Sequence, residues 1–101
     1  GEASPILQQF GASDHAPIQI SQNVLKKALD KHEIDHAQLI GTGSAIQAPL
    51  AVFASKRGDD HIVLLTEVAH ASGNVIAALE LNRQRDQYLV NDIRSLHPMD
   101  A

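Results

Sequence analysis

Two histidines four positions apart are the first residues in this chain that could carry chemistry. They enclose the segment His32-Glu-Ile-Asp-His36, which matches the zinc-binding pattern H-E-x-x-H. In that pattern the two histidines hold the metal from one face of a helix, and the glutamate acts as a general base. Asp35 is charged where the pattern usually has an uncharged residue, and nothing points to a third ligand. A zinc-dependent hydrolase is thus one interpretation of this segment, supported by the match to the pattern and opposed by these two observations.

A second set of candidates consists of polar residues that share a strand face with apolar ones. Asn91 and Ser95 have the same parity as Ile93, and Thr66 has the same parity as Leu64. Because successive side chains of a strand point to opposite faces, we expect all three polar residues to point inward. Buried polar groups need hydrogen-bond partners, so these residues either bond within the core or mark the rim of a site.

A helix is needed to position His32. Ser21 precedes an apolar-periodic run that ends at His32, which predicts a helix with Ser21 as its N-cap. Leu25, Ala28, Leu29 and His32 fall at helical spacing and form the face that packs on the sheet. His32 then lies at the C-terminal end of the buried face, where it either packs as a core residue or has a functional role.

The segments on either side of this helix carry weaker signals. Residues 34–47 predict a short helix followed by a loop at Gly41-Thr-Gly-Ser44, which lacks the lysine of a phosphate-binding loop and the third glycine of a dinucleotide fingerprint. Residues 1–17 contain Pro5, Gly11 and Pro17 and no sustained periodicity, which predicts an irregular arm or one short helix around Ile6 to Phe10. We therefore expect an arm at 1–17 and one domain at 18–101.

The remaining segments are rich in β-branched and large apolar residues and are separated by short polar connections, which favours antiparallel hairpins. The predicted strands are residues 49–55, 61–68, 74–81 and 87–95. The predicted fold class is α+β, with one or two N-terminal helices packed on a four-stranded antiparallel meander sheet.

Composition limits the function classes. The chain has 101 residues, a net charge of −4 with neutral histidines, and no cysteine, which excludes disulfides and thiolate chemistry. No stretch approaches the roughly 20 apolar residues of a membrane span. The acidic balance argues against a broad nucleic-acid-binding surface, although it allows a local basic patch.

The order and spacing of five segments resemble a known family over residues 18–98. The segments are Lys31-His-Glu-Ile34, Pro49-Leu-Ala-Val-Phe-Ala-Ser55, Ile62-Val-Leu-Leu-Thr-Glu-Val68, Val75-Ile-Ala-Ala-Leu-Glu-Leu-Asn82 and Val90-Asn-Asp-Ile-Arg-Ser95. They are similar to the nuclease-like domains at the ends of phage MuF and large polyvalent proteins, which are grouped with the barnase, EndoU, colicin and RelE (BECR) superfamily of metal-independent ribonucleases. The resemblance implies a BECR-like toxin or effector domain that cleaves RNA without a cofactor.

The resemblance also implies a set of site residues. His32 would transfer the proton of a ribose 2′-hydroxyl, and Thr66 and Ser95 would bind or orient the phosphate. The implied substrate-binding residues are Lys27, Ser55, Asn91 and Arg94. His97 stands where the family commonly has an aromatic residue, and we interpret it as a tolerated surface substitution rather than a second acid or base. If this mechanism holds, Thr66, Asn91 and Ser95 lie near the end of the helix that carries His32.

The partners and location that the resemblance implies are those of a delivered toxin. They are RNA, including tRNA, and a cognate immunity or antitoxin protein, with action in the cytoplasm of a target cell after delivery by a phage or a secreted parent protein. The chain begins with Gly1 rather than Met, so we also expect it to be part of a larger polypeptide. A third interpretation is a non-enzymatic interaction module, in which His32, Thr66 and Ser95 would all be buried and bonded internally.

Overall fold

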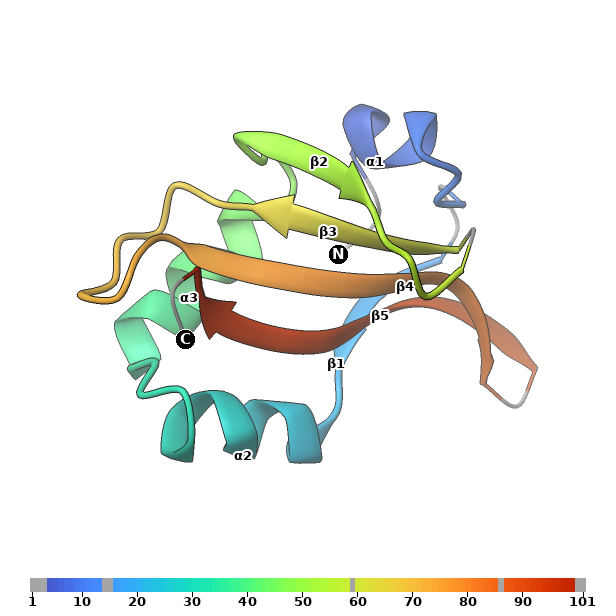
Figure 1. The fold of residues 1–101 in the computed structure, drawn as a ribbon. Helices are drawn as coiled ribbons and strands as arrows, with labels where there is room; N and C mark the ends of the chain where they lie inside the picture. Colours follow the sequence, from blue (N-terminus) through green and yellow to red (C-terminus); the bar gives the residue numbers. More distant parts are fainter. Residues whose placement is uncertain (1–3, 14–15, 59, 86, 100–101) are drawn as a thin grey trace.

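The structure is a computed structural model that describes residues 4–13, 16–58, 60–85 and 87–99, and these residues form an α+β fold (Figure 1). Helices precede most of the strands, and the long C-terminal hairpin lies in the middle of the sheet. The elements in chain order are α1 (Pro5–Gln9), β1 (Ile18–Ile20), α2 (Gln22–Asp30), α3 (His36–Ala45), β2 (Ala51–Ala54), β3 (His61–Leu65), β4 (Val75–Arg85) and β5 (Tyr88–Pro98).

The sheet contains the predicted meander and one strand more. Strands β2 to β5 pair antiparallel in sequence order, as expected, while β1 pairs parallel with β5 and gives the order β1-β5-β4-β3-β2. The sheet is therefore five-stranded and mixed, and the prediction of a purely antiparallel four-stranded sheet was wrong in this respect. Strand β1 is only three residues long and follows Pro17, so it carries too little alternation to be recognised.

The described part of residues 1–17, which were expected to form an arm, contributes to the core. Helix α1 agrees with the short helix considered for this region, and its Leu7 is completely buried in the main apolar cluster. The backbone around Gly11 is held by Asn82, whose Nδ2 donates to the Gly11 carbonyl at 2.7 Å. The described part of this segment therefore packs onto the sheet.

Helix α2 begins as predicted, because the Ser21 hydroxyl accepts the Val24 N–H at 3.2 Å. Helix α3 differs from the prediction, because Gly41-Thr-Gly-Ser44 is helical and not a loop. A capping box between Asp35 and Gln38 starts α3, and the buried Thr42 hydroxyl donates to the Gln38 carbonyl at 2.7 Å. These bonds and tertiary packing outweigh the low helix propensity of glycine.

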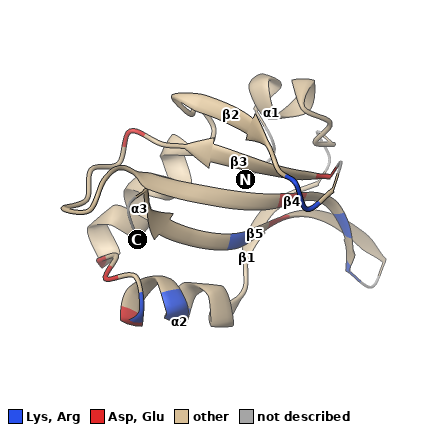
Figure 2. Ribbon diagram, in the orientation of Figure 1, with Lys and Arg blue, Asp and Glu red and all other residues tan. Residues whose placement is uncertain are grey.

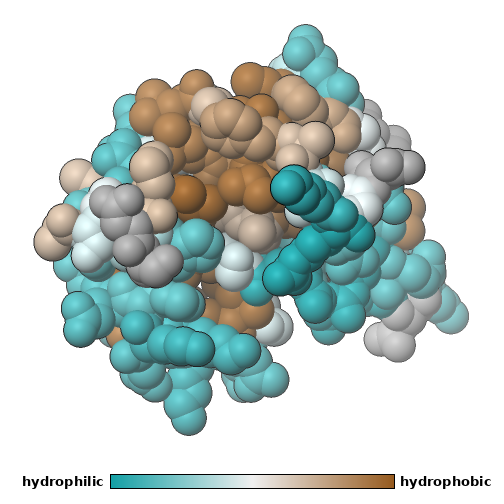
Figure 3. Space-filling view, viewed as in Figure 1, coloured by the Kyte–Doolittle hydropathy of each residue, from teal (hydrophilic) through white to brown (hydrophobic). Residues whose placement is uncertain are grey.

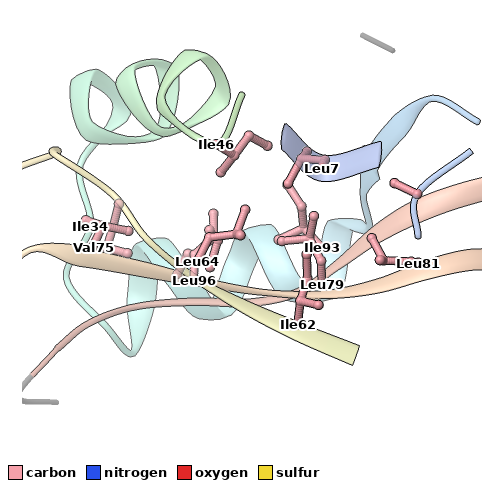
Figure 4. Packing of buried hydrophobic residues seen from close by; sticks show 13 residues of the cluster. Leu7, Ile34, Ile46, Ile62, Leu64, Val75, Leu79, Leu81, Ile93 and Leu96 are labelled. Atoms are coloured by element: carbon pink, nitrogen blue, oxygen red, sulfur yellow. The ribbon is translucent and has the colours of Figure 1, made fainter. Parts of the chain in front are cut away.

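The helices leave one face of the sheet open. Leu7 of α1 and Ile46 at the end of α3 pack on the same side of the sheet (Figure 4). Helix α2 lies beside β5 at the edge of the sheet, with Ala28 completely buried (Figure 1). The strand residues of the core are Ile62, Leu64, Val75, Ala77, Leu79, Leu81, Ile93 and Leu96.

Candidate functional site

A cleft of about 480 Å³ lies between the C-terminal end of α2 and the open face of the sheet. Its walls carry four cationic residues, three histidines and two serines, and none of the described residues that line it is acidic. These polar residues are Lys27, Lys31, Arg57, Arg94, His32, His61, His97, Ser55 and Ser95. Figure 2 shows cationic positions on α2, on β5 and in the loop after β2, three elements that are distant in sequence. The cleft is thus locally cationic in a protein with a net charge of −4.

The fold brings together most of the residues that the sequence and the resemblance singled out. Lys27, His32, Ser55, Arg94 and Ser95 all line this cleft. Thr66 and Asn91 do not line it; both are completely buried and bonded within the protein. The expectation that all three inward polar residues gather at the end of α2 therefore holds for Ser95 alone.

His32 is held by the way α2 ends. The helix stops at Asp30, and Glu33 adopts a left-handed backbone with φ of 56°. The N–H of the buried Ile34 then donates back to the Ala28 carbonyl at 2.9 Å. From the other side, His70 Nε2 donates to the Glu33 carbonyl at 3.2 Å. This junction fixes the backbone on which His32 stands and directs its ring into the cleft.

The same junction separates the two histidines of the H-E-x-x-H pattern. His32 follows α2, whereas His36 is the first residue of α3 and is exposed, with Asp35 acting as the N-cap between them. The pattern requires both histidines on one turn of one helix, but residues 32–36 do not form a continuous helix. Among the residues that the structure describes, no group of three or more His, Asp or Glu is placed to hold a metal ion.

The His32 ring is half-buried and lies among positive groups. Removal from water, followed by the effects of His97, Lys31 and Lys27, lowers the pKa of His32 below its ordinary value of 6.5. A histidine with a lowered pKa is mainly neutral at pH 7 and can accept a proton. This property agrees with the proton-transfer role expected for His32.

His97 belongs to the cleft and not to the outer surface. Its ring centroid lies 5.8 Å from that of His32, and its Nδ1 donates to the Pro98 carbonyl at 2.9 Å. Because a carbonyl oxygen only accepts, the proton of neutral His97 is on Nδ1 and its Nε2 is left with a lone pair. The interpretation of His97 as a surface substitution does not agree with this position.

A β-bulge at Arg94 brings Ser95 into the cleft. Ile93 pairs with Leu79 in the core, but Ser95 pairs with Ala78, so one residue of β5 is extra at this point. A bulge reverses the parity of the residues that follow it. Ser95 therefore points to the open face, opposite to Ile93, and the sequence prediction of an inward Ser95 was wrong. The bulge itself is what places Ser95 beside the cationic groups.

The cationic side chains of the cleft are partly held by two carboxylates at its border. The buried Asp92 carboxylate contacts Arg94 at 3.4 Å and Arg83 at 2.7 Å. Glu80 lies 3.9 Å from the Arg94 guanidinium and 3.6 Å from His61 Nε2. These contacts orient Arg94 and His61 before any ligand binds, which reduces the ordering that binding requires.

The loop after β2 supplies the opposite wall. The Ser55 N–H pairs with the His61 carbonyl at 3.0 Å, and the Ser55 hydroxyl accepts the Arg57 N–H at 3.2 Å. Ser55 thus shapes the turn that presents Arg57. Three further residues of the cleft, Lys31, Arg57 and His61, were not among the predicted site residues, because local sequence pattern gives no indication that a loop and a helix end face the same cleft.

Asn91 and Thr66 stabilise the fold. Asn91 Oδ1 accepts the Asn82 N–H at 3.0 Å, and its Nδ2 donates to the Ala16 carbonyl at 3.0 Å, which joins the N-terminal segment to the sheet. The Thr66 hydroxyl donates to the Val75 carbonyl at 2.8 Å and joins β3 to the start of β4. The role of phosphate ligand expected for Thr66 is therefore not supported by its position.

The substitution Thr66→Val tests the structural role of Thr66. It keeps the shape of the side chain but removes the hydroxyl that donates to the Val75 carbonyl and accepts the Val68 N–H. We expect the free energy of unfolding to fall by about 1–2 kcal/mol in urea titrations. Thr66→Ser keeps the hydroxyl and serves as the control; a loss in Thr66→Ser without a loss in Thr66→Val would show that the methyl group, and not the hydroxyl, matters.

No helix of the described residues is long and apolar enough to cross a membrane.

Comparison with curated proteins and with solved structures gave no match. The family model described as Phage MuF-C-terminal domain matches residues 23–101, which include α2 from its second residue, α3, β2 to β5 and all residues that line the cleft. The chain therefore belongs to the phage MuF C-terminal domain family.

Proposed function

We propose that this domain is a ribonuclease that cleaves RNA by attack of a ribose 2′-hydroxyl on the adjacent phosphate. The observation that carries the proposal is the cleft itself, in which four cations, three histidines and two serines converge. The nearest described carboxylates, those of Asp92 and Glu80, lie at its border against Arg94 and His61. Such a lining suits a phosphodiester, because cations neutralise the phosphate while histidines transfer protons at neutral pH.

In the proposed reaction His32 is the general base. The neutral ring takes the 2′-hydroxyl proton, the 2′-oxygen forms a bond to phosphorus, and the bond from phosphorus to the 5′-oxygen of the next nucleotide breaks. The Ser95 hydroxyl donates a hydrogen bond to a phosphate oxygen, and Arg94 and Lys27 stabilise the added negative charge. The products are a 2′,3′-cyclic phosphate and a 5′-hydroxyl.

We propose His61 as the group that protonates the leaving oxygen. On the open face, His61 pairs with Glu80, two residues along β4 from the Ala78 that pairs with Ser95. His61 on β3 and Ser95 on β5 are thus separated by about 7 Å along the strands and, because β4 lies between them, by about 10 Å across the sheet. His97 lies two residues beyond Ser95 in the other direction, next to His32. A phosphate at Ser95 would thus have His32 toward one end of the cleft and His61 toward the other, which is the order that a base and an acid on opposite sides of the phosphate need.

The proposal includes no metal ion. Mg²⁺ prefers carboxylate oxygens, and the described lining of the cleft offers cations and imidazoles instead. The non-enzymatic interpretation expected His32, Thr66 and Ser95 all to be buried and bonded internally. Thr66 meets this expectation, whereas His32 and Ser95 are half-exposed in the cleft. The zinc interpretation requires a helical turn through both histidines, which is not formed.

The setting proposed for this activity is that of a phage-delivered toxin or effector. The family is described as a C-terminal domain, which supports the expectation that the chain is part of a larger phage polypeptide. RNA, including tRNA in the cytoplasm of a target cell, is the proposed substrate. A cell that makes such an enzyme needs an immunity or antitoxin protein, which we propose as a second partner.

Incubation of the purified domain with tRNA and with total RNA in EDTA tests the proposal. We expect cleavage that persists in EDTA and leaves 2′,3′-cyclic phosphate ends, detected by their resistance to phosphatase and sensitivity to acid. Cleavage that disappears in EDTA and returns with Zn²⁺ would favour the hydrolase alternative. Absence of cleavage of any RNA, at protein concentrations where the folded domain is verified by circular dichroism, would contradict the proposal.

A further inference from the structure

An apolar row crosses the open face of the sheet and ends at the cationic cleft. Ser95 on β5 pairs with Ala78 on β4, Ala78 with Val63 on β3, and Val63 with Phe53 on β2. Ala78 and Val63 form part of the floor of the cleft, and Phe53 continues the row with 55% of its surface exposed. Figure 3 shows this apolar area over β2, β3 and β4, next to the hydrophilic groups that border the hollow.

Phe53 is placed outward by the register of the sheet. Its neighbour Val52 packs against the core, so Phe53 points to the open face. The sequence contains only three aromatic residues, and Phe53 is the one that lies in this row. Strands are spaced by about 4.8 Å, which puts the Phe53 backbone about 14 Å from that of Ser95. An extended nucleic-acid strand covers this distance with few nucleotides.

We propose that this row is a base-binding subsite that accepts unpaired nucleobases of a single-stranded RNA whose phosphate lies at Ser95. This inference rests on the proposed ribonuclease function and specifies its substrate class. A ligand that fits the whole surface must be anionic at one end and flat and apolar at the other. A nucleotide has this arrangement, and bases stack on exposed aromatic rings in single-strand-binding proteins.

A duplex does not satisfy the same surface. The faces of paired bases are covered by their neighbours in the stack, so a double helix would present only its backbone to Phe53. A second copy of the chain could cover the apolar row, but two copies joined by this same face would bring their cationic clefts together, and like charges repel. Charge and shape together therefore favour an unpaired strand as the occupant.

Binding of short oligoribonucleotides carrying 2′-O-methyl groups tests the subsite, because they lack the attacking hydroxyl and are not cleaved. We expect Phe53→Ala to weaken binding of the single strand by about 5- to 100-fold in fluorescence anisotropy titrations. Phe53→Trp is expected to retain binding. Tyr88→Ala, which removes a ring that is also exposed but lies at the tip of the β4–β5 hairpin, is the matched control and is expected to bind as the wild type does.

Three results would overturn the subsite. The first is that Phe53→Ala binds the single strand as tightly as the wild type does, while Arg94→Ala no longer binds it. This result would reject the base-binding subsite but would still support phosphate binding in the cleft and the proposed ribonuclease function. The second is binding of duplex RNA as tight as that of single strands. The third is a wild-type dimer that Phe53→Ala converts to a monomer in sedimentation, which would assign the face to a second copy. Failure of the wild type to bind or cleave any RNA would instead reject the ribonuclease function on which the subsite depends.

Discussion

We expect His32→Ala to lower the rate of RNA cleavage by about 10²- to 10⁴-fold, the usual contribution of a general base. His32 lies at the end of α2, its ring faces the cleft, and its lowered pKa keeps it neutral and able to accept a proton. The substitution removes the proton acceptor but leaves the cationic groups in place. Affinity for an uncleavable RNA should therefore change much less than the rate does, and single-turnover assays would separate the two.

His36→Ala is the matched control for this experiment. It removes the other histidine of the H-E-x-x-H pattern from an exposed position at the start of α3, four residues away. We expect cleavage by this variant to equal that of the wild type. If both substitutions abolish activity and the wild type contains stoichiometric zinc, the metal interpretation is correct. If His32→Ala retains full activity while folded, His32 is not the base.

The pH dependence provides a second measurement on the same residue. Because the pKa of His32 is lowered below 6.5, the acid limb of the rate profile should fall at a pH below 6.5. The same shift affects stability: below pH 6.5 the unfolded chain binds more protons than the folded protein. The free energy of unfolding should therefore decrease as the pH falls below 6.5, and His32→Ala should remove this part of the decrease.

The parts of the fold that follow from short-range periodicity were predictable. The meander of β2 to β5 and the Ser21 cap of α2 agree with the structure because alternation and capping are local signals. Strand β1 and the helical state of Gly41 to Ser44 depend on tertiary contacts. A three-residue parallel strand and a glycine-containing helix have no local signature that distinguishes them from loops.

The site was predictable in its residue types but not in its geometry. The resemblance selected His32 and Ser95 correctly as neighbours, yet strict alternation along β5 put Ser95 inward. A single bulge at Arg94 reverses that parity, and bulges leave little trace in a sequence. For Asn91 the alternation gave the correct, inward direction, but not the role. Its amide bonds to the backbone of Ala16 and Asn82 instead of lining the cleft.

Asn91→Ala should be the most destabilising polar substitution tested, with a loss of about 2–4 kcal/mol in the free energy of unfolding. The Asn91 side chain is completely buried and satisfies both the Asn82 N–H and the Ala16 carbonyl. Alanine leaves these two backbone groups without that partner and leaves space where the amide was. Urea denaturation measures the loss, and Asn23→Ala, the same change at an exposed position of α2, should alter the free energy by less than about 0.5 kcal/mol.

We expect Asn91→Ala to loosen the pairing of β1 with β5 more than it loosens the rest of the sheet. Asn91 joins β5 to the segment that leads into β1, where its own N–H also donates to the Pro17 carbonyl at 2.8 Å. Loss of the side-chain bonds should increase amide hydrogen exchange most in β1, while the β3–β4 pairing that carries His61 stays protected. Because Asn91 lies outside the cleft, cleavage by the folded fraction should be retained. A variant that is fully stable but inactive would contradict this structural role and would return Asn91 to the site.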